Sequence, residues 1–178
     1  SILHYQLSIR FAFMDGIVGM IKLSLHPAAP DGWLLCDGTH LEINAFPELF
    51  AVIASKFGGD DLHFALPDMR DEQAHHLIKA KPSPADAHFQ GLVSQMVLWA
   101  GEEIPANWLP CDGRPIVGAE YPILQKVAAQ GMPGGLPEGF HLPKSESKPG
   151  LKFIICMHGQ DPMVAMAPPA AKNDDDDY

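Results

Sequence analysis

The sequence predicts a β-rich α+β protein in which one structural unit occurs twice in tandem. Two hexapeptides carry this prediction: Trp33 to Gly38 is Trp-Leu-Leu-Cys-Asp-Gly, and Trp108 to Gly113, 75 residues further on, is Trp-Leu-Pro-Cys-Asp-Gly. Matching residues flank both hexapeptides at the same offset, among them the pairs Gly16/Gly91, Val18/Val93, Pro30/Pro105, Pro47/Pro122 and Gly59/Gly134. A repeat of this length is too long for a solenoid and has the size of a small domain. The 17 prolines and 16 glycines indicate many turns and short elements rather than long helices.

Each unit is expected to contain short strands and one short helix. Residues 16–25 and 91–99 are rich in apolar and β-branched side chains, which is typical of strands. A loop with proline follows each of them, and then a short strand that ends in Asp-Gly, a turn signal. Residues 46–54 and 121–129 carry proline near their start and apolar residues at helical spacing, which predicts a helix in each unit. The apolar run 151–157 predicts a buried strand near the end of the second unit.

These elements divide the chain into four parts. Residues 1–79 are expected to form the first unit with an N-terminal strand, and residues 80–88, which contain Lys-Pro-Ser-Pro-Ala-Asp, to form a linker. Residues 89–162 are expected to form a second, more degenerate unit, followed by an extended acidic tail at 163–178 that ends in the run Asp174 to Asp177 and Tyr178. Units of this size are near the lower limit for a self-sufficient core, so we expect them to pack on each other or on other subunits.

The charge balance excludes some classes of function. The formal net charge is −10, from 22 acidic and 12 basic side chains, so nucleic acid is not expected as a partner. No apolar stretch is long enough to span a bilayer, and no membrane insertion is expected. His4, Arg10 and Asp15 interrupt the N-terminal stretch, so no signal peptide is expected, and Ser1 is consistent with removal of an initiator methionine.

The three cysteines favour a structural role. Cys36 and Cys111 occupy the same repeat position, Cys156 is the third, and no C-x-x-C pair is present. The odd number argues against a disulfide framework, and the spacing argues against a zinc site. Free cysteine is among the most frequently buried residue types, so we expect small buried side chains rather than reactive thiols. A hydrolase that pairs Cys36 or Cys111 with a distant histidine is the alternative, and no positive signal supports it.

Residues 14–70 contain five sequence blocks in a fixed order: Gly16-Ile17, residues 30–38, Pro47 to Phe50, Phe57 to Asp60, and Phe64 to Arg70. The order and spacing of these blocks resemble the phage tail collar family. This family includes the receptor-binding end of phage short tail fibres and the bacterial proteins called microcystin-dependent. The second unit keeps the hexapeptide and Pro122, but it has Pro143-Lys144 where the first has Pro67-Asp68, and it lacks the arginine that follows. The residues that we assign to the structural fingerprint are Trp33, Cys36, Asp37, Gly38, Pro67, Asp68, Trp108, Cys111, Asp112 and Gly113.

The resemblance implies a non-enzymatic structural and attachment component of a phage tail, in a fibre, a tip or a baseplate adaptor. Its expected place is the tail of the virion, after synthesis in the host cytoplasm. Its expected partners are other tail or fibre proteins, a host surface glycan, and further copies of itself, with a trimer favoured. A bacterial microcystin-dependent-type protein of a phage-derived injection machine is the alternative within the same family. No cofactor is implied. Some fibre tips bind metal through His-x-His pairs, but this chain has only the adjacent His75-His76, so no metal site is expected.

Several residues admit both a binding and a structural interpretation. The two tryptophans of the hexapeptides offer faces on which sugars stack, but their place in the fingerprint favours packing within each unit. Asp37 and Asp112 are possible acid/base carboxylates in type, but each precedes glycine in a turn, where the side chain bonds the backbone. Trp99 has no tryptophan counterpart, because Ser24 stands at the matching position, and this makes it a candidate for contact with a partner.

Two further groups are candidates for contacts outside the unit. His75 and His76 follow the Pro67 to Arg70 block, and they are candidate receptor or partner contacts, since adjacent histidines point apart and do not converge on a metal. The acidic run Asp174 to Asp177 has the hard oxygen ligands of a calcium site but no glycine turn or loop spacing, so a solvated or partner-bound tail is favoured.

Overall fold

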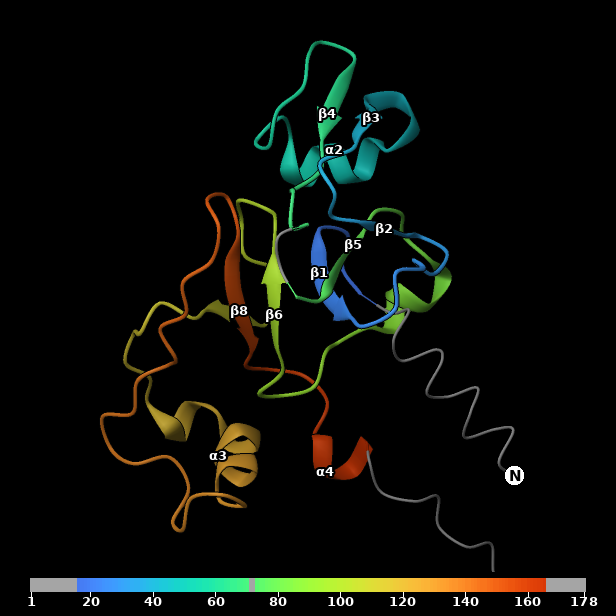
Figure 1. Cartoon of the computed structure of the whole chain (residues 1–178). Helices are drawn as coiled ribbons and strands as arrows, with labels where there is room; N and C mark the ends of the chain where they lie inside the picture. Colours follow the sequence, from blue (N-terminus) through green and yellow to red (C-terminus); the bar gives the residue numbers. More distant parts are fainter. Residues whose placement is uncertain (1–15, 71–72, 166–178) are drawn as a thin grey trace, which may run out of the picture.

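The computed structural model describes residues 16–70 and 73–165. The N-terminal strand proposed within residues 1–15 and the acidic tail after residue 165 therefore lie outside the described residues. The described elements are short, as the proline and glycine content predicts (Figure 1). In chain order they are β1 (Met20–Ser24), β2 (Trp33–Leu35), β3 (His40–Glu42), the 3-10 turn Ile43–Ala45, α2 (Pro47–Ile53), β4 (His63–Ala65), β5 (His75–Lys79), the 3-10 turn Pro84–His88, β6 (Met96–Trp99), β7 (Trp108–Pro110), the 3-10 turn Gly118–Glu120, α3 (Pro122–Ala128), β8 (Lys152–Cys156) and α4 (Pro162–Ala165).

One antiparallel sheet runs through the whole molecule. Its six strands lie in the order β2-β5-β1-β6-β8-β7, so three come from each half of the chain. The halves join through β1 and β6, where Met20 lies opposite Trp99 and Ile21 opposite Leu98. Outward from this central pair, the first half places β1, β5 and β2 in sequence and the second half places β6, β8 and β7 (Figure 1). Equivalent strands thus occupy equivalent places on the two sides of the centre. The predicted α+β, β-rich fold class is confirmed.

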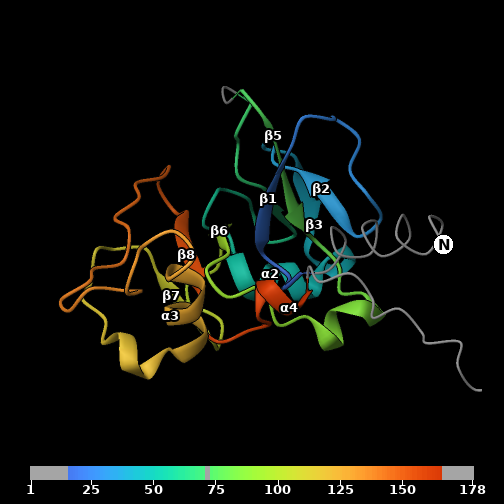
Figure 2. The same cartoon turned by 90° about the horizontal axis from the view of Figure 1, so that it is seen from below.

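The two helices form where proline allows a helix to begin. α2 and α3 both start with proline, whose missing N–H costs nothing in the first turn of a helix. α2 buries Leu49 and Ile53 against the sheet, and α3 buries Leu124. Seen from below, α3 lies beside β7 and β8, on the side of the sheet remote from β2 (Figure 2). The predicted helices at 46–54 and 121–129 are confirmed to within one residue at each end.

A small second sheet follows α2 in the first half. β3 pairs antiparallel with β4, with His40 opposite Ala65 and Glu42 opposite His63. Before β4, the chain turns tightly at Gly59, which has φ +137°. A Cβ atom on this glycine would lie 2.2 Å from the backbone oxygen of His63, so no larger residue fits without moving the backbone. In the second half the corresponding pairing is reduced to a single bridge between Pro115 and His141.

The two halves share a hydrophobic core. The largest buried cluster contains Leu49, Ile53 and Phe64 of the first half, all at most 1% exposed. Leu98 and Leu151 of the second half belong to the same cluster. Burial of this apolar surface, at roughly 25 cal/mol per Å², is the main stabilising contribution to such a fold. The two halves of the chain therefore pack on each other.

Some predicted boundaries are wrong. The strands expected at 16–25 and 91–99 begin only at Met20 and Met96, because turns with positive φ at Gly19 and Ser94 precede them. Within the segment 80–88, which stays a predicted linker, Ala80 is 1% exposed and Pro84–His88 form a 3-10 turn. No helix among the described residues is long and apolar enough to cross a membrane.

Candidate binding site

Both fingerprint tryptophans are buried and pack on glycine. Trp33 is 2% exposed and Trp108 is 5% exposed. A Cβ on Gly16 would lie 3.2 Å from the Trp33 ring, and one on Gly91 would lie 2.7 Å from the Trp108 ring. The Nζ atoms of two lysines, Lys22 and Lys79, lie 5.1 Å and 5.5 Å from the centre of the Trp33 ring. The two indole rings are therefore largely covered by the protein itself, which agrees with the packing interpretation.

The two fingerprint aspartates stabilise turns. Asp37 accepts a hydrogen bond at 3.0 Å from the backbone N–H of Thr39, and Asp112 accepts one at 3.1 Å from that of Arg114. Each aspartate side chain thus accepts from the backbone N–H two residues further along the chain, as expected of aspartate in a turn. Asp37 also lies in an isolated bridge with Asp68. Asp112 makes the corresponding bridge with Lys144.

A charged cluster surrounds each of these turns. In the first half Arg70 binds Asp68, with an Nη2–Oδ2 distance of 2.5 Å. In the second half Arg114 binds Asp112, with an Nη2–Oδ2 distance of 2.7 Å. The side-chain and backbone hydrogen bonds from Arg70 lower the pKa of the exposed Asp68 to about 2. The second unit has no arginine after Pro143-Lys144. Arg114, which directly follows Asp112-Gly113, supplies the arginine beside the turn instead.

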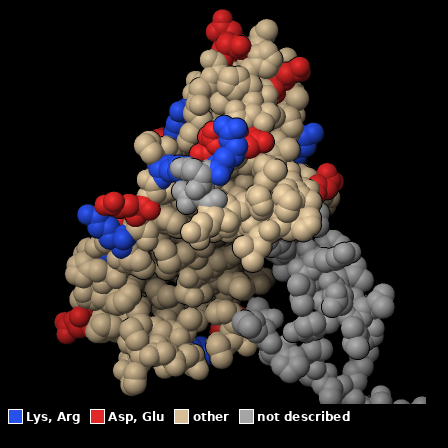
Figure 3. Space-filling view, viewed as in Figure 1, with Lys and Arg blue, Asp and Glu red and all other residues tan. Residues whose placement is uncertain are grey.

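The charges on the visible surface are mixed in sign. In Figure 3, lysine and arginine side chains lie beside aspartate and glutamate in several clusters, without a large area of one sign on that face. Lys148 also joins the two halves, since its Nζ donates at 3.2 Å to the backbone oxygen of Asp68. Such pairing produces local order rather than an electrostatic surface for a polyanion.

The cysteine thiols are not poised for nucleophilic chemistry. All three are buried and unpaired. Burial, assisted by the neighbouring charge of Asp37, raises the pKa of the Cys36 thiol to about 12. Burial also raises the pKa of Cys111, again with a smaller contribution from the adjacent aspartate, and raises that of Cys156 to about 11. Because the thiolate is the reactive form, burial and the raised pKa of each thiol disfavour nucleophilic attack near neutral pH.

The three candidate contact residues, Trp99, His75 and His76, differ in how far their side chains are exposed. Trp99 is only 3% exposed, and its indole N–H donates at 2.9 Å to the backbone oxygen of Glu103. The ring is therefore packed inside the protein, and the contact predicted for it from its lack of a tryptophan counterpart stays a prediction. His75 is exposed on β5, whereas His76 is 7% exposed with Nδ1 3.1 Å from the backbone oxygen of Ala74. Of the three, only His75 is placed where a partner reaches it, and its contact remains a prediction.

Trp99 also explains an asymmetry between the halves. A Cβ on Gly19 would lie 3.4 Å from the Trp99 ring and 2.6 Å from Val52, so indole and valine meet beside this glycine. At the repeat offset, Gly19 and Val52 correspond to Ser94 and Val127, and these two line an open apolar cavity of about 190 Å³ in the second half. Trp99 thus fills a space beside Gly19 and Val52 in the first half. The corresponding space in the second half, beside Ser94 and Val127, is open.

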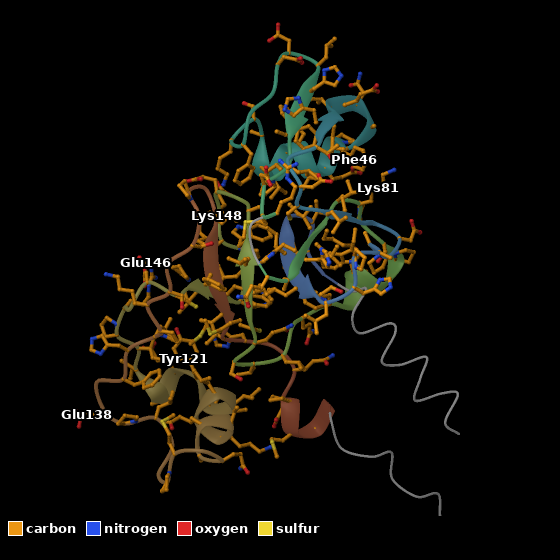
Figure 4. All side chains as sticks on the ribbon, in the orientation of Figure 1. Phe46, Lys81, Tyr121, Glu138, Glu146 and Lys148 are labelled. Atoms are coloured by element: carbon orange, nitrogen blue, oxygen red, sulfur yellow. The ribbon has the colours of Figure 1, made fainter. Side chains whose placement is uncertain are left out.

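A groove of mixed polar and apolar character lies at the β2 edge of the first half. Its volume is about 310 Å³. One wall is the turn before β2, which contains Asp31 and Gly32, and the other wall is formed by Phe46 and Lys81. The two side chains of the second wall lie together in Figure 4, and the Lys81 Nζ is 4.9 Å from the centre of the Phe46 ring. The sequence analysis missed this groove, because Phe46 was assigned only to a helix start and Lys81 only to the linker.

The described residues offer no metal centre. Within residues 16–70 and 73–165, no three or more His, Cys, Asp or Glu side chains gather where they could hold a metal ion. The acidic run Asp174 to Asp177 lies outside the described residues. Of the two cavities described above, the groove at Phe46 is the one lined by charged side chains.

Comparison with known proteins assigns the first half to a family. Residues 19–74 match the family model described as the phage tail collar domain, so this half carries that domain. The chain is also similar to Protein RhiB of Rhizobium leguminosarum bv. viciae, with 44% identity over 43 residues. These residues make up 22% of this chain and 20% of RhiB, so the chain spans about a fifth of that relative. No solved structure matches the chain.

Proposed function

We propose that this protein is a structural and attachment component of a phage tail, acting in a fibre, a tip or a baseplate adaptor. The observation that carries the proposal is the match of residues 19–74 to the phage tail collar domain. The role is binding: a rigid double scaffold holds loops toward a neighbouring tail protein or a host surface glycan. No catalytic role is proposed, in keeping with a structural family and with three buried thiols.

We also propose that the chain contains two collar-like units, at 1–79 and 89–162. Equivalent backbone hydrogen bonds support this proposal. In the first half the Cys36 N–H donates to His76 and the Cys36 oxygen accepts from Met69; in the second half the Cys111 N–H donates to Phe153 and the Cys111 oxygen accepts from Ser145. Repeated long-range bonds at repeated residues are the expected signature of a duplicated unit.

A homotrimer is the proposed assembly, with six similar lobes from three chains. The family resemblance suggests this state, and cyclic symmetry is common among homo-oligomers. Mass measurement of the purified protein tests it. A monodisperse monomer at the concentrations found in assembled particles contradicts the trimer.

The bacterial alternative within the same family is favoured by one observation. Protein RhiB, to which part of the chain is similar, belongs to a bacterium. In this alternative the protein is part of a phage-derived injection machine of a bacterial cell rather than of an infectious virion.

Particle fractionation tests the proposed function. An epitope-tagged chain is expressed in the cells that encode it, contractile or tubular particles are purified, and the tag is located by immunogold labelling. We expect label at the distal end or the baseplate of a tail. Recovery of the whole tagged pool as free protein, with no label on particles, overturns the tail role in both its viral and its bacterial form.

A further inference from the structure

The groove between Asp31 and Lys81 has a rigid backbone frame. The Trp33 N–H donates at 3.0 Å to the Pro30 oxygen, which closes a turn around Asp31 and Gly32. Gly32 has φ +79°, as the third residue of a type II turn requires, and its oxygen accepts the N–H groups of Ala80 and Lys81 at 2.8 and 3.1 Å. The turn is thus tied to the chain that leaves β5. The backbone on the two sides of the groove, at the Asp31-Gly32 turn and at Lys81, is therefore held together by hydrogen bonds.

The chemistry of the walls suits a polyhydroxylated ligand. Phe46 is half-buried at the start of α2 with the Lys81 Nζ 4.9 Å from the centre of its ring, while Asp31 and Lys81 are exposed. An aromatic face packs against the C–H face of a pyranose ring, the carboxylate accepts hydrogen bonds from neighbouring hydroxyls, and the ammonium group donates to hydroxyl oxygens. The two charges cancel formally, which favours an uncharged ligand. The volume lies at the lower end of the range for ligand pockets, about 300–1,000 Å³, so one sugar residue fits rather than an extended chain.

The second half contains a modified counterpart of this frame. The oxygen of Asn107, which has φ +71°, accepts the N–H groups of Met157 and His158 at 2.8 and 3.2 Å, just as Gly32 accepts those of Ala80 and Lys81. The rings of Tyr121 and His158 lie 5.2 Å apart, at the positions of Phe46 and Lys81. Ala106 replaces Asp31, so this counterpart has no carboxylate on the turn. The chain therefore supplies its own comparison site.

We propose that the groove at Asp31, Phe46 and Lys81 binds a single neutral hexose residue of a surface glycan. The inference rests on the proposed attachment function and names the ligand class and the site for it. Asp31 and Lys81 hold the hydroxyl groups, and Phe46 packs against the sugar ring. The second half, which lacks the carboxylate, does not bind the same sugar with comparable affinity.

Binding of the full chain to defined sugars tests the proposal. The probes are albumin conjugates that carry glucose, galactose, mannose or N-acetylglucosamine, with a sialyllactose conjugate as the acidic probe, measured by biolayer interferometry. We expect saturable binding to at least one neutral conjugate. Asp31→Ala weakens this binding about tenfold or more, because a hydrogen bond to a charged group is lost. Lys81→Met keeps the apolar stem beside Phe46 and removes only the ammonium group, and it also weakens binding.

The matched control is Tyr121→Ala in the second half, which leaves binding within about twofold of the parent. Far-UV circular dichroism and the urea midpoint of each variant establish that it is folded; if Asp31→Ala does not fold, Lys81→Met decides. The proposal is overturned if no neutral conjugate binds, if only the sialylated conjugate binds, or if both groove variants bind like the parent. It is also overturned if Tyr121→Ala causes the same loss as Asp31→Ala.

Fractionation of particles that contain the Asp31→Ala chain separates this proposal from the tail role. If the chain is recovered normally in tails but the parent protein binds no sugar, the proposed tail role stands and only the proposed sugar site is ruled out. If the protein binds sugar but never enters particles, the proposed tail role is ruled out and the groove remains a sugar site.

Discussion

Removal of Asp86 is expected to destabilise the protein more than removal of any exposed carboxylate. The Asp86 side chain is 14% exposed, and its Oδ1 lies 3.1 Å from the Nζ of Lys79, whose side chain is 1% exposed. Asp86 also accepts backbone N–H groups from Gly16 at 3.2 Å and from Ser83 at 2.5 Å. Breaking a buried ion pair by removing one partner costs about 3–5 kcal/mol. Asp86→Ala is therefore expected to remove a large part of a total free energy of unfolding of about 5–15 kcal/mol.

The pH dependence of this contribution follows from the direction of the pKa shift. Burial opposes the charge on Asp86, but hydrogen bonds from Ser83, Lys79 and Gly16 outweigh it and hold the pKa below its ordinary value. The folded-state pKa is thus lower than the unfolded value of about 3.9. The stabilisation is fully present above the unfolded pKa and is lost as the pH falls toward the folded one. We expect the difference between parent and Asp86→Ala to be constant near neutral pH and to shrink below about pH 4.

Urea unfolding followed by tryptophan fluorescence measures both effects. Asp61→Ala removes an exposed carboxylate from the first half and serves as the matched control, with an expected change within about 0.5 kcal/mol. The double variant Lys79→Met/Asp86→Ala is expected to recover part of the loss, because it no longer buries a charge without its carboxylate. The reasoning is refuted if Asp86→Ala costs less than about 1 kcal/mol at pH 7, or if the double variant is no more stable than the single one.

Three further predictions concern a buried tryptophan, a glycine in a tight turn and the three buried cysteines. Trp99→Ala is expected to cost about 3–5 kcal/mol in urea unfolding, because a buried indole is replaced by a cavity. Gly59→Ala is expected to cost more than about 1 kcal/mol, because a Cβ there meets backbone at positive φ. Cys36, Cys111 and Cys156 are expected to resist iodoacetamide at pH 8 in the native protein and to react together once urea unfolds it, because burial raises the pKa of each thiol.

Each of these predictions has its own control. Gly131→Ala is the comparison for Gly59→Ala, since a Cβ at Gly131 meets no atom within 4 Å, and equal losses in the two variants contradict the steric argument. A stability of Trp99→Ala close to that of the parent contradicts the packing of the indole. Rapid labelling of Cys36 or Cys111 in the native state, at the rate of a free thiol, reopens the hydrolase alternative.

The sequence alone determined the local elements and the fingerprint. Proline followed by apolar residues at helical spacing is enough to start α2 and α3, since proline at the first helical position and burial of one face are local requirements. The Asp-Gly turns and the burial of both fingerprint tryptophans also follow from short patterns. The blocks in residues 14–70 led to the collar family, which the match over 19–74 confirms.

Only the tertiary structure decided how the halves meet. The pairing of β1 with β6 depends on hydrogen bonds and on burial between residues 77 and 79 positions apart in sequence, Ile21 with Leu98 and Met20 with Trp99, and no local periodicity encodes such a partner. The same long-range packing buried Trp99, whose lack of a counterpart had made it a candidate for contact with a partner. It also turned part of the expected linker into a buried anchor at Asp86, and it brought Phe46 and Lys81 together as one wall of a groove. Side chains far apart in sequence form a site only after the fold has fixed their distance and direction, and this is why the repeat was visible in the sequence and the groove was not.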